Sequence, residues 1–225
     1  AWRAAPRTSL STLGFIGMTL EGTSSLVSAS GVAEVTFADE AQTANDLVPG
    51  LKAQGADAIV LAIHEGGEQS AGSDPQGCEG LTGAIRDIAQ RLDPRIDLIV
   101  SGHTHKAYVC DLAGSDPQRP VLLTSAGAAG TLVTDIAIDI DPVAGRVIAR
   151  RARQVAVDHQ TTQPRSDVAA YLAQYVEAAR PIAARQVGRL SGSAARGEDR
   201  MGGTLGNLVA DAQLGMTLVD GAQIA

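Results

Sequence analysis

The stretch ADAIVLAIH, residues 56–64, is a nearly continuous apolar run that ends in a histidine. Such a run is typical of a β-strand covered on both faces, as in a parallel sheet. EGLTGAIRDIAQRLD (79–93) then has helical spacing of its apolar residues, and IDLIVSG (96–102) has the pattern of a second buried strand. Strand, helix and strand at this spacing predict a βαβ unit and a sheet that is at least partly parallel.

Further strands and helices flank this unit. Residues 13–19 (LGFIGMT) and 32–37 (VAEVTF) predict strands, and residues 38–55 predict a helix that begins at an Asp39 cap. Four later strand patterns predict an antiparallel meander ending in a hairpin: AYVCDL, PVLLTSA, TLVTDIAIDI and RVIARRARQVAV. Together these patterns predict an α/β fold class with mixed α+β character.

Two more helices are expected later in the sequence. Residues 166–185 place Val168 and Leu172 on one apolar face after a Ser166 cap, as in a long helix that links two domains. Residues 202–219 also have a helical pattern. The roughly forty residues after the linker are too few for a stable domain. We therefore expect this piece to pack on the first domain or to need sequence that this chain does not contain.

Composition narrows the classes of function. Hydrophobic residues make up 44% of the 225 residues, charged residues make up 19%, and the formal net charge is −7. This charge argues against a general binder of nucleic acid polymers or membrane surfaces, because both need a basic face. No apolar run approaches the roughly 18 residues of a membrane span. A small anionic substrate held by a metal is compatible with this composition.

Three histidines follow the two buried strands. His64 ends the first strand, and His103 and His105 follow the second. Side chains at the carboxyl ends of neighbouring parallel strands share one crevice, so His64 and His103 are expected to point into one pocket. A lone histidine is more often structural, but three at adjacent strand ends favour a metal site. Gly102 is expected to let the chain turn so that both later imidazoles point to one place.

Three other polar residues, Thr104, Lys106 and His159, are not expected to take part in catalysis. Thr104 and Lys106 are expected to face solvent, and His159 is expected to lie in a surface loop. The residues alone do not decide the pairing state of Cys78 and Cys110. Two free buried thiols and a disulfide are both compatible with the sequence. A disulfide would indicate an oxidising compartment.

Six segments occur in one order along the chain: GFIGMTLEGT, AIVLAIHEGG, LIVSGHTHKAY, TSAGAAGTLVTDIAID, the linker helix and LGNLVADAQ. This ordered set resembles the calcineurin-like metallophosphoesterases, and more closely their secreted 5′-nucleotidase and 2′,3′-cyclic-nucleotide phosphodiesterase branch. The resemblance implies part of a four-layer α-β-β-α sandwich over residues 1–157. It further implies a linker with a helix over 158–186 and the start of an incomplete second α/β domain, the nucleotidase C-terminal domain, over 187–225.

The resemblance implies a hydrolase of nucleotide phosphates with two divalent cations. Zn, Mn, Fe, Co and Ni all suit imidazole ligands, so the ligand type does not determine the identity of the metal. In the family two cations about 3.5–4 Å apart clamp a phosphoryl group and activate water. By resemblance, His64 and His103 bind one cation and His105 binds the other. Arg196 and Arg200 match arginines that approach substrate phosphates, although a solvated charged loop is the plainer interpretation.

The resemblance also bears on Cys78 and Cys110. In that branch a cysteine before the helix and one just after G-H-T-H-x-x-Y can pair, so a disulfide is expected here. It implies a periplasmic or extracellular location.

The sequence departs from the family pattern as well. The D-x-H, G-D-x-x-D and G-N-H-[DE] motifs, which supply the other metal ligands and the histidine that assists the leaving group, do not occur among the 225 residues. We therefore expect a fragment of a longer protein that is catalytically incomplete alone. Its apolar sheet face is expected to self-associate or to meet the missing N-terminal half. Alternative activities are hydrolysis of cyclic nucleotides, nucleotide-sugars, other phosphate esters or thiosulfate esters.

Overall fold

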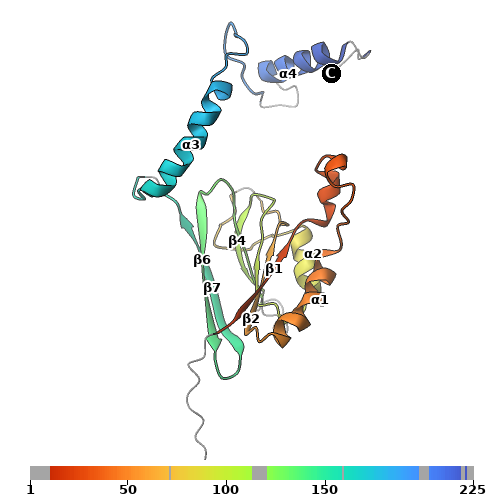
Figure 1. Cartoon of the computed structure of the whole chain (residues 1–225), viewed down its shortest axis with the longest axis vertical. Coiled ribbons are helices and arrows are strands. Elements are labelled where there is room, and N and C mark those ends of the chain that lie inside the picture. The colour runs from red at the N-terminus through yellow and green to blue at the C-terminus, as the bar shows by residue number, and fades with distance from the viewer. Residues whose placement is uncertain are drawn as a thin grey trace, which may run out of the picture. The chain divides into compact units, whose positions relative to one another are not determined.

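The chain divides into two compact units, Ala1–Gln163 and Pro164–Ala225. The computed structural model (Figure 1) describes the residues 11–70, 72–112, 121–158, 160–197, 203–218 and 221. The division falls inside the linker expected over 158–186. The family identities assigned to the domains stay predictions.

The first unit contains a five-stranded sheet in the order β1-β2-β3-β5-β4. Its strands are β1 (Leu13–Met18), β2 (Ala58–Ile63), β3 (Leu98–Val100), β4 (Ala107–Asp111) and β5 (Leu122–Ala126). Three neighbouring pairs, β1–β2, β2–β3 and β3–β5, are parallel, and β4 pairs with β5 antiparallel. The mostly parallel sheet confirms the predicted βαβ unit, and it gathers the carboxyl ends of four strands at one edge.

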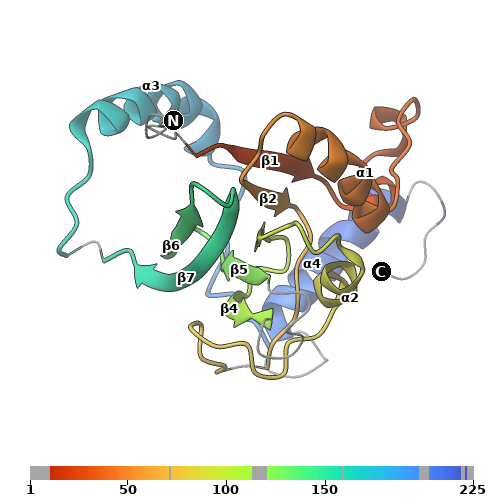
Figure 2. The same cartoon turned by 90° about the horizontal axis from the view of Figure 1, so that it is seen from below.

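Two helices, α1 (Glu40–Ala53) and α2 (Ala84–Arg91), cover one face of this sheet (Figure 2). The main core lies between them and the sheet, and its largest fully buried aliphatic members are Ile59, Leu61, Leu81, Ile85, Ile96, Ile99 and Leu123. As expected, Asp39 caps α1, because its Oδ1 accepts a hydrogen bond from the Gln42 N–H at 2.8 Å.

The opposite face of the sheet is partly covered by an antiparallel hairpin of β6 (Leu132–Asp141) and β7 (Arg146–Ala156). A smaller apolar cluster joins the hairpin to the sheet, formed by Val60, Leu98, Leu122, Val109, Ile136, Ile138 and Ala152. The first unit therefore has helix, sheet and hairpin layers (Figure 2). The hairpin confirms the prediction, but β5 and β6 lie in different sheets, so the expected continuous meander is wrong.

The edge strand β1 exposes apolar side chains on the face away from the helices. Phe15 is 65% exposed and Leu13 is 41% exposed. Ile16, which alternates with them, is buried in the main core. Among the described residues, neither Phe15 nor Leu13 belongs to the cluster beneath the hairpin. The hairpin thus leaves this edge of the sheet open.

Residues 32–37 do not form the predicted strand. They follow two 3-10 turns, Glu21–Ser25 and Ala29–Gly31, and lead to α1 without pairing to the sheet. Val35 is 57% exposed, so the apolar alternation in this segment faces no core. Strand formation depends on a partner and a buried face, which an isolated pattern of six residues cannot guarantee.

The described residues of the second unit form two helices, α3 (Ser166–Ala183) and α4 (Gly203–Thr217). Both were expected, but the N-cap position of α3 belongs to Arg165, which makes no side-chain cap hydrogen bond. Ser166 is the first helical residue, so its predicted capping role is wrong. Within the described part of the chain, no helix is long and apolar enough to cross a membrane.

Candidate metal centre

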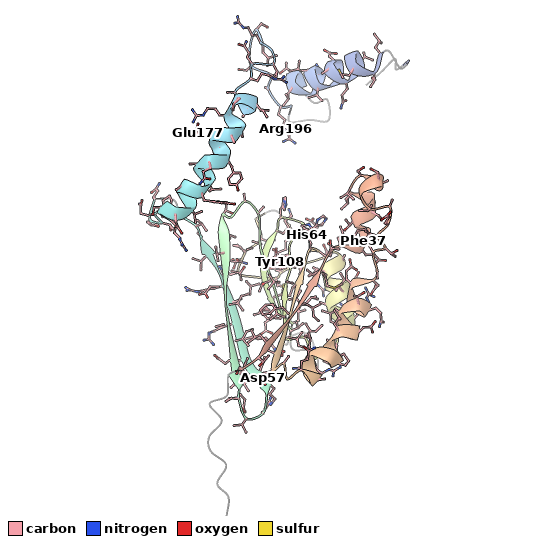
Figure 3. The ribbon with its side chains drawn as sticks, viewed as in Figure 1. Phe37, Asp57, His64, Tyr108, Glu177 and Arg196 are labelled. Carbon is pink, nitrogen blue, oxygen red and sulfur yellow. A yellow bond between two sulfur atoms is a disulfide. The ribbon has the colours of Figure 1, made fainter. Side chains whose placement is uncertain are left out.

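His64 and His103 come from two neighbouring parallel strands. β2 ends at Ile63 and β3 at Val100, and their register pairs Ala62 with Val100. The two histidines therefore follow their strands at the same edge of the sheet. Figure 3 shows His64 at the opposite end of the sheet from Asp57, the residue just before β2. In α/β sheets, ligands bind in the crevice just outside this edge, where the carboxyl ends of the strands lie.

The two imidazoles meet through one nitrogen each. The Nδ1 atom of His103 lies 3.2 Å from the Nε2 atom of His64, and the ring centroids are 5.0 Å apart in an edge-to-face arrangement. Two nitrogens that bind one divalent cation at about 2.0–2.1 Å are about 2.9–3.4 Å apart for ligand angles between about 90° and 109°. The observed separation suits a shared cation, and both side chains are open to solvent.

The chain reverses sharply after β3, but Gly102 is not the reason. His103 and His105 themselves have left-handed backbone angles, with φ of 67° and 61°. Such values are uncommon for residues other than glycine, and they concentrate at functional sites. Gly102 has an ordinary φ, and a Cβ at this position would meet no atom within 4 Å. The predicted role of Gly102 in the turn is therefore wrong.

His105 lies apart from the histidine pair as a ligand. It is exposed, and it does not form a three-ligand group with His64 and His103. The one such group among the described residues is Glu21, Asp39 and Glu40, where Glu40 Oε1 already accepts from the Glu21 N–H. Assignment of His105 to a second cation stays a prediction.

The loops that carry the two histidines are joined directly. The Gly102 N–H donates to the Glu65 carbonyl at 3.1 Å, and Thr104 Oγ1 donates to the Gly67 carbonyl at 2.7 Å. A Cβ on Gly66 would lie 2.0 Å from the Gly102 carbonyl oxygen. Only glycine permits this approach. Thr104, which was expected to face solvent, instead binds the neighbouring loop.

A buried tyrosine forms hydrogen bonds with the segments of both histidines. Tyr108 is fully buried, and its hydroxyl accepts from the Gly67 N–H at 3.1 Å and lies 2.7 Å from Ser101 Oγ. Ser101 Oγ donates onward to the Thr124 carbonyl at 2.9 Å, so the tyrosine donates to Ser101. Burial raises the pKa of Tyr108, which keeps the phenol protonated as a donor.

Sequence reasoning gave Tyr108 no role beyond its place in the G-H-T-H-x-x-Y pattern. The available signal is the alternation in AYVCD, which places Tyr108 and Cys110 on one buried face of β4. A buried tyrosine hydroxyl needs a partner, so that position predicts a polar contact inside the core.

The disulfide between Cys78 and Cys110 is present, with a Cα–Cα distance of 5.0 Å, as the resemblance implied. It joins the segment after His64 to β4, two residues beyond Tyr108. Beside it, the Val109 N–H donates to the Gly77 carbonyl at 3.1 Å. The disulfide thus links the segment that follows His64 covalently to the segment that follows His103.

Of the remaining residues singled out in the sequence, the structure describes Arg196 and Lys106. Arg196 is exposed and lies in the second unit. Arg200 and His159 lie outside the described residues. Lys106 makes an exposed ion pair with Glu68 at 3.7 Å, in keeping with its expected solvent-facing position.

Three curated proteins resemble the chain in sequence, while no family model matches it. "Endonuclease YhcR" of Bacillus subtilis is 28% identical over 198 residues, 88% of this chain and 15% of that protein. "Cell wall protein Lmo0130" of Listeria monocytogenes is 26% identical over 70% of this chain and 20% of its own length. "Trifunctional nucleotide phosphoesterase protein YfkN" of Bacillus subtilis is 36% identical over 33% of this chain and 5% of its own length. The chain thus spans a small part of each relative.

Solved structures share the fold at lower identity. Calcineurin-like phosphoesterase YfkN of Bacillus subtilis has a TM-score of 0.58 and 19% identity, over 77% of this chain and 53% of that one. A 5′-nucleotidase precursor of Thermus thermophilus has a TM-score of 0.58 and 21% identity, over 84% and 37%. The sulfate thiohydrolase SoxB of Thermus thermophilus has a TM-score of 0.57 and 22% identity, over 80% and 28%.

Proposed function

We propose that this chain, which is similar in sequence and fold to proteins of the 5′-nucleotidase and calcineurin-like phosphoesterase family, contributes the histidine side of a two-metal phosphoesterase site. His64 and His103 hold one divalent cation, and His105 is a ligand of the second. The substrate is a phosphate ester, with a nucleotide 5′-phosphate as the first candidate.

The observation that carries this proposal is the 3.2 Å distance between His103 Nδ1 and His64 Nε2 at the carboxyl edge of a parallel sheet. The two nitrogens lie within hydrogen-bond distance of each other, and His103 has a left-handed backbone angle, with φ of 67°. A purely structural pair would not need two solvent-accessible imidazoles from separate loops.

Each residue has a defined task in the proposed site. Bound divalent cations would supply an activated water and neutralise the charge of the phosphoryl group. The neutral imidazoles of His64 and His103 fix the position of one cation through Nε2 and Nδ1. Arg196 and Arg200 would contact substrate phosphates as bidentate donors. With a formal net charge of −7, such local cations would offset the repulsion between the protein and an anionic substrate.

Hydrolysis is expected to need more than these residues. The D-x-H, G-D-x-x-D and G-N-H-[DE] motifs are absent from the 225 residues, so the histidines complete only part of a two-metal ligand set. We expect the chain alone to bind metal without turnover. The disulfide and the cell-wall relative support a location outside the cytoplasm.

A second candidate is hydrolysis of phosphodiesters. It is supported by the long sequence match to a protein named as an endonuclease. The acidic net charge opposes a polymeric substrate, so a small diester such as a cyclic nucleotide is the better form of this candidate. A thiosulfate ester is supported by fold alone.

Titration calorimetry with Mn²⁺ and Zn²⁺ tests the metal proposal. Wild type is expected to bind, and His64→Ala and His103→Ala are each expected to lose binding at this site. His159→Ala is the control histidine and is expected to bind as wild type does. Equal binding by all four proteins would contradict the proposal.

Activity is tested on a longer protein that carries the three ligand motifs. With Mn²⁺ or Zn²⁺, para-nitrophenyl phosphate and 5′-AMP are expected to be hydrolysed, and His103→Ala abolishes turnover. Preference for bis-para-nitrophenyl phosphate or 2′,3′-cyclic AMP would select the diester candidate. Thiosulfate esters alone as substrates would overturn phosphoester hydrolysis. Turnover by the 225-residue chain itself would contradict its incompleteness.

A further inference from the structure

The polar groups beneath the candidate metal centre form one continuous chain of hydrogen bonds. It begins at the Gly67 N–H, passes through the hydroxyls of Tyr108 and Ser101, and ends at the Thr124 carbonyl. Tyr108, Ser101 and Thr124 are all buried. Every buried polar group in this path has a partner, which favours a single arrangement of the segments it joins.

The segments joined by Tyr108 are those that carry the histidine pair. Gly67 is three residues after His64, and Ser101 is two residues before His103. The tyrosine itself is on β4, which the disulfide ties to the segment after His64. One hydroxyl therefore contacts both histidine loops from a strand that contributes neither histidine.

We propose that Tyr108 is a positioning residue, whose hydroxyl fixes the separation of the His64 and His103 loops and so prepares the two imidazoles to share one divalent cation. This inference rests on the proposed metal site. The loops also contact directly, through Gly102 N–H to Glu65 and through Thr104 to Gly67. The Tyr108 hydroxyl adds a buried contact to the segment of each histidine, and so fixes both loops relative to β4 and to each other.

The role belongs to the hydroxyl rather than to the ring. Phenylalanine at position 108 would keep the apolar contacts in the main core, to which Tyr108 belongs. It would remove the acceptor for Gly67 and the donor to Ser101, and leave a buried N–H without a partner. Loss of a hydrogen bond made directly to a metal ligand lowers metal affinity by roughly 10- to 100-fold in metalloproteins. The Tyr108 hydroxyl contacts Gly67 and Ser101 rather than the histidines, so an effect near the lower end of this range is expected.

Tyr108→Phe tests the inference, with Ser101→Ala as a second variant that removes the other end of the contact. Tyr171→Phe is the matched control, because Tyr171 also makes a hydroxyl contact, to Tyr175 at 2.9 Å, but in the second unit. Zn²⁺ affinity and the visible spectrum of bound Co²⁺ are measured. Metal-free protein is compared by NMR for the nuclear Overhauser effect between the His64 and His103 rings and for hydrogen exchange at Gly67.

We expect Tyr108→Phe to weaken Zn²⁺ binding by roughly 10-fold or more, to alter the Co²⁺ spectrum, to speed exchange at Gly67 and to weaken the contact between the two rings. Ser101→Ala is expected to act in the same direction, and Tyr171→Phe to match wild type. Unchanged affinity, spectrum and ring contact in both core variants would overturn the inference. Wild type that binds no metal would contradict the proposed function, while the metal-free ring contact would still decide the role of Tyr108.

Discussion

His103 and His64 are 39 residues apart in sequence, yet His103 Nδ1 lies 3.2 Å from His64 Nε2. The βαβ unit explains this proximity, because two parallel neighbouring strands end at one edge of the sheet. Hydrogen bonds from Gly102 to Glu65 and from Thr104 to Gly67 join the two loops beyond the strands.

Gly66→Ala is expected to disrupt the contact between the histidine loops. A Cβ at this position would lie 2.0 Å from the Gly102 carbonyl oxygen, which is backbone and cannot rotate away. We expect a loss of about 1–3 kcal/mol in the free energy of unfolding and weaker metal binding. Urea denaturation and calorimetry measure the two effects.

Gly50→Ala is the matched glycine control for that variant. Gly50 lies inside α1, and its Cβ would meet no atom within 4 Å. Alanine there is expected to stabilise the helix by about 0.5–1 kcal/mol without affecting metal binding. If both glycine variants behave alike, the close approach at Gly66 has no structural importance.

Removal of the disulfide is expected to destabilise the first unit. Cys78 and Cys110 are separated by 32 residues, and closing a loop of that length contributes about 2–4 kcal/mol by restricting the unfolded chain. Cys78→Ser with Cys110→Ser is compared with wild type in urea, with and without reductant. A wild-type midpoint that reductant does not lower would contradict a stabilising disulfide.

Asp39 gives the stability of α1 a pH dependence. The Gln42 N–H and then the Arg91 guanidinium lower the pKa of Asp39 in the folded protein below its usual 3.8. A lowered folded pKa stabilises the protein above pH 3.8, and this contribution is lost as the pH falls through the folded pKa. Asn at position 39 keeps a capping oxygen without the charge.

The expected result for Asp39→Asn is lower stability than wild type near neutral pH and a shrinking difference below pH 3.8. Urea midpoints at a series of pH values measure it, with exposed Glu34→Gln as a control for removal of an acidic charge. A difference between Asp39→Asn and wild type that does not vary with pH would exclude the ionised carboxylate as its source.

The open face of β1 is expected to drive self-association. Phe15 and Leu13 are side by side on this face, with 65% and 41% of their surfaces exposed. Light scattering over a range of concentrations should show oligomers in wild type and fewer in Phe15→Ser. Val143→Ser is the control, because Val143 is 96% exposed in the turn of the hairpin. A wild-type monomer at all concentrations would rule out this behaviour.

The sequence predicts the sheet well where apolar runs are long. β2 and β3 are recognisable in the sequence because buried parallel strands need continuous apolar residues. The helix between them is recognisable because its apolar residues recur with a regular helical period. The strand predicted for residues 32–37 does not form. A pattern of six residues does not indicate whether a neighbouring strand is present to pair with it. The separation of β5 from β6 depends on packing between layers, which alternation along one strand does not encode.

The candidate site is predictable in part. Strand order and a family resemblance predict that His64 and His103 lie together. The sequence predicts that Gly102 makes the sharp turn, but His103 and His105 adopt the left-handed angles themselves. Backbone strain of this kind depends on tertiary contacts. The contacts of Tyr108 and Thr104 with Gly67 join residues more than thirty positions apart, so no local pattern reveals them.

The most direct test of the account is nitrogen-15 NMR of the imidazole rings during a Zn²⁺ titration. The Nδ1 resonance of His103 and the Nε2 resonance of His64 are expected to shift together as the first equivalent binds, while their other ring nitrogens do not become ligands. Shifts at only one of these histidines, or at neither, would contradict a cation shared by His64 and His103.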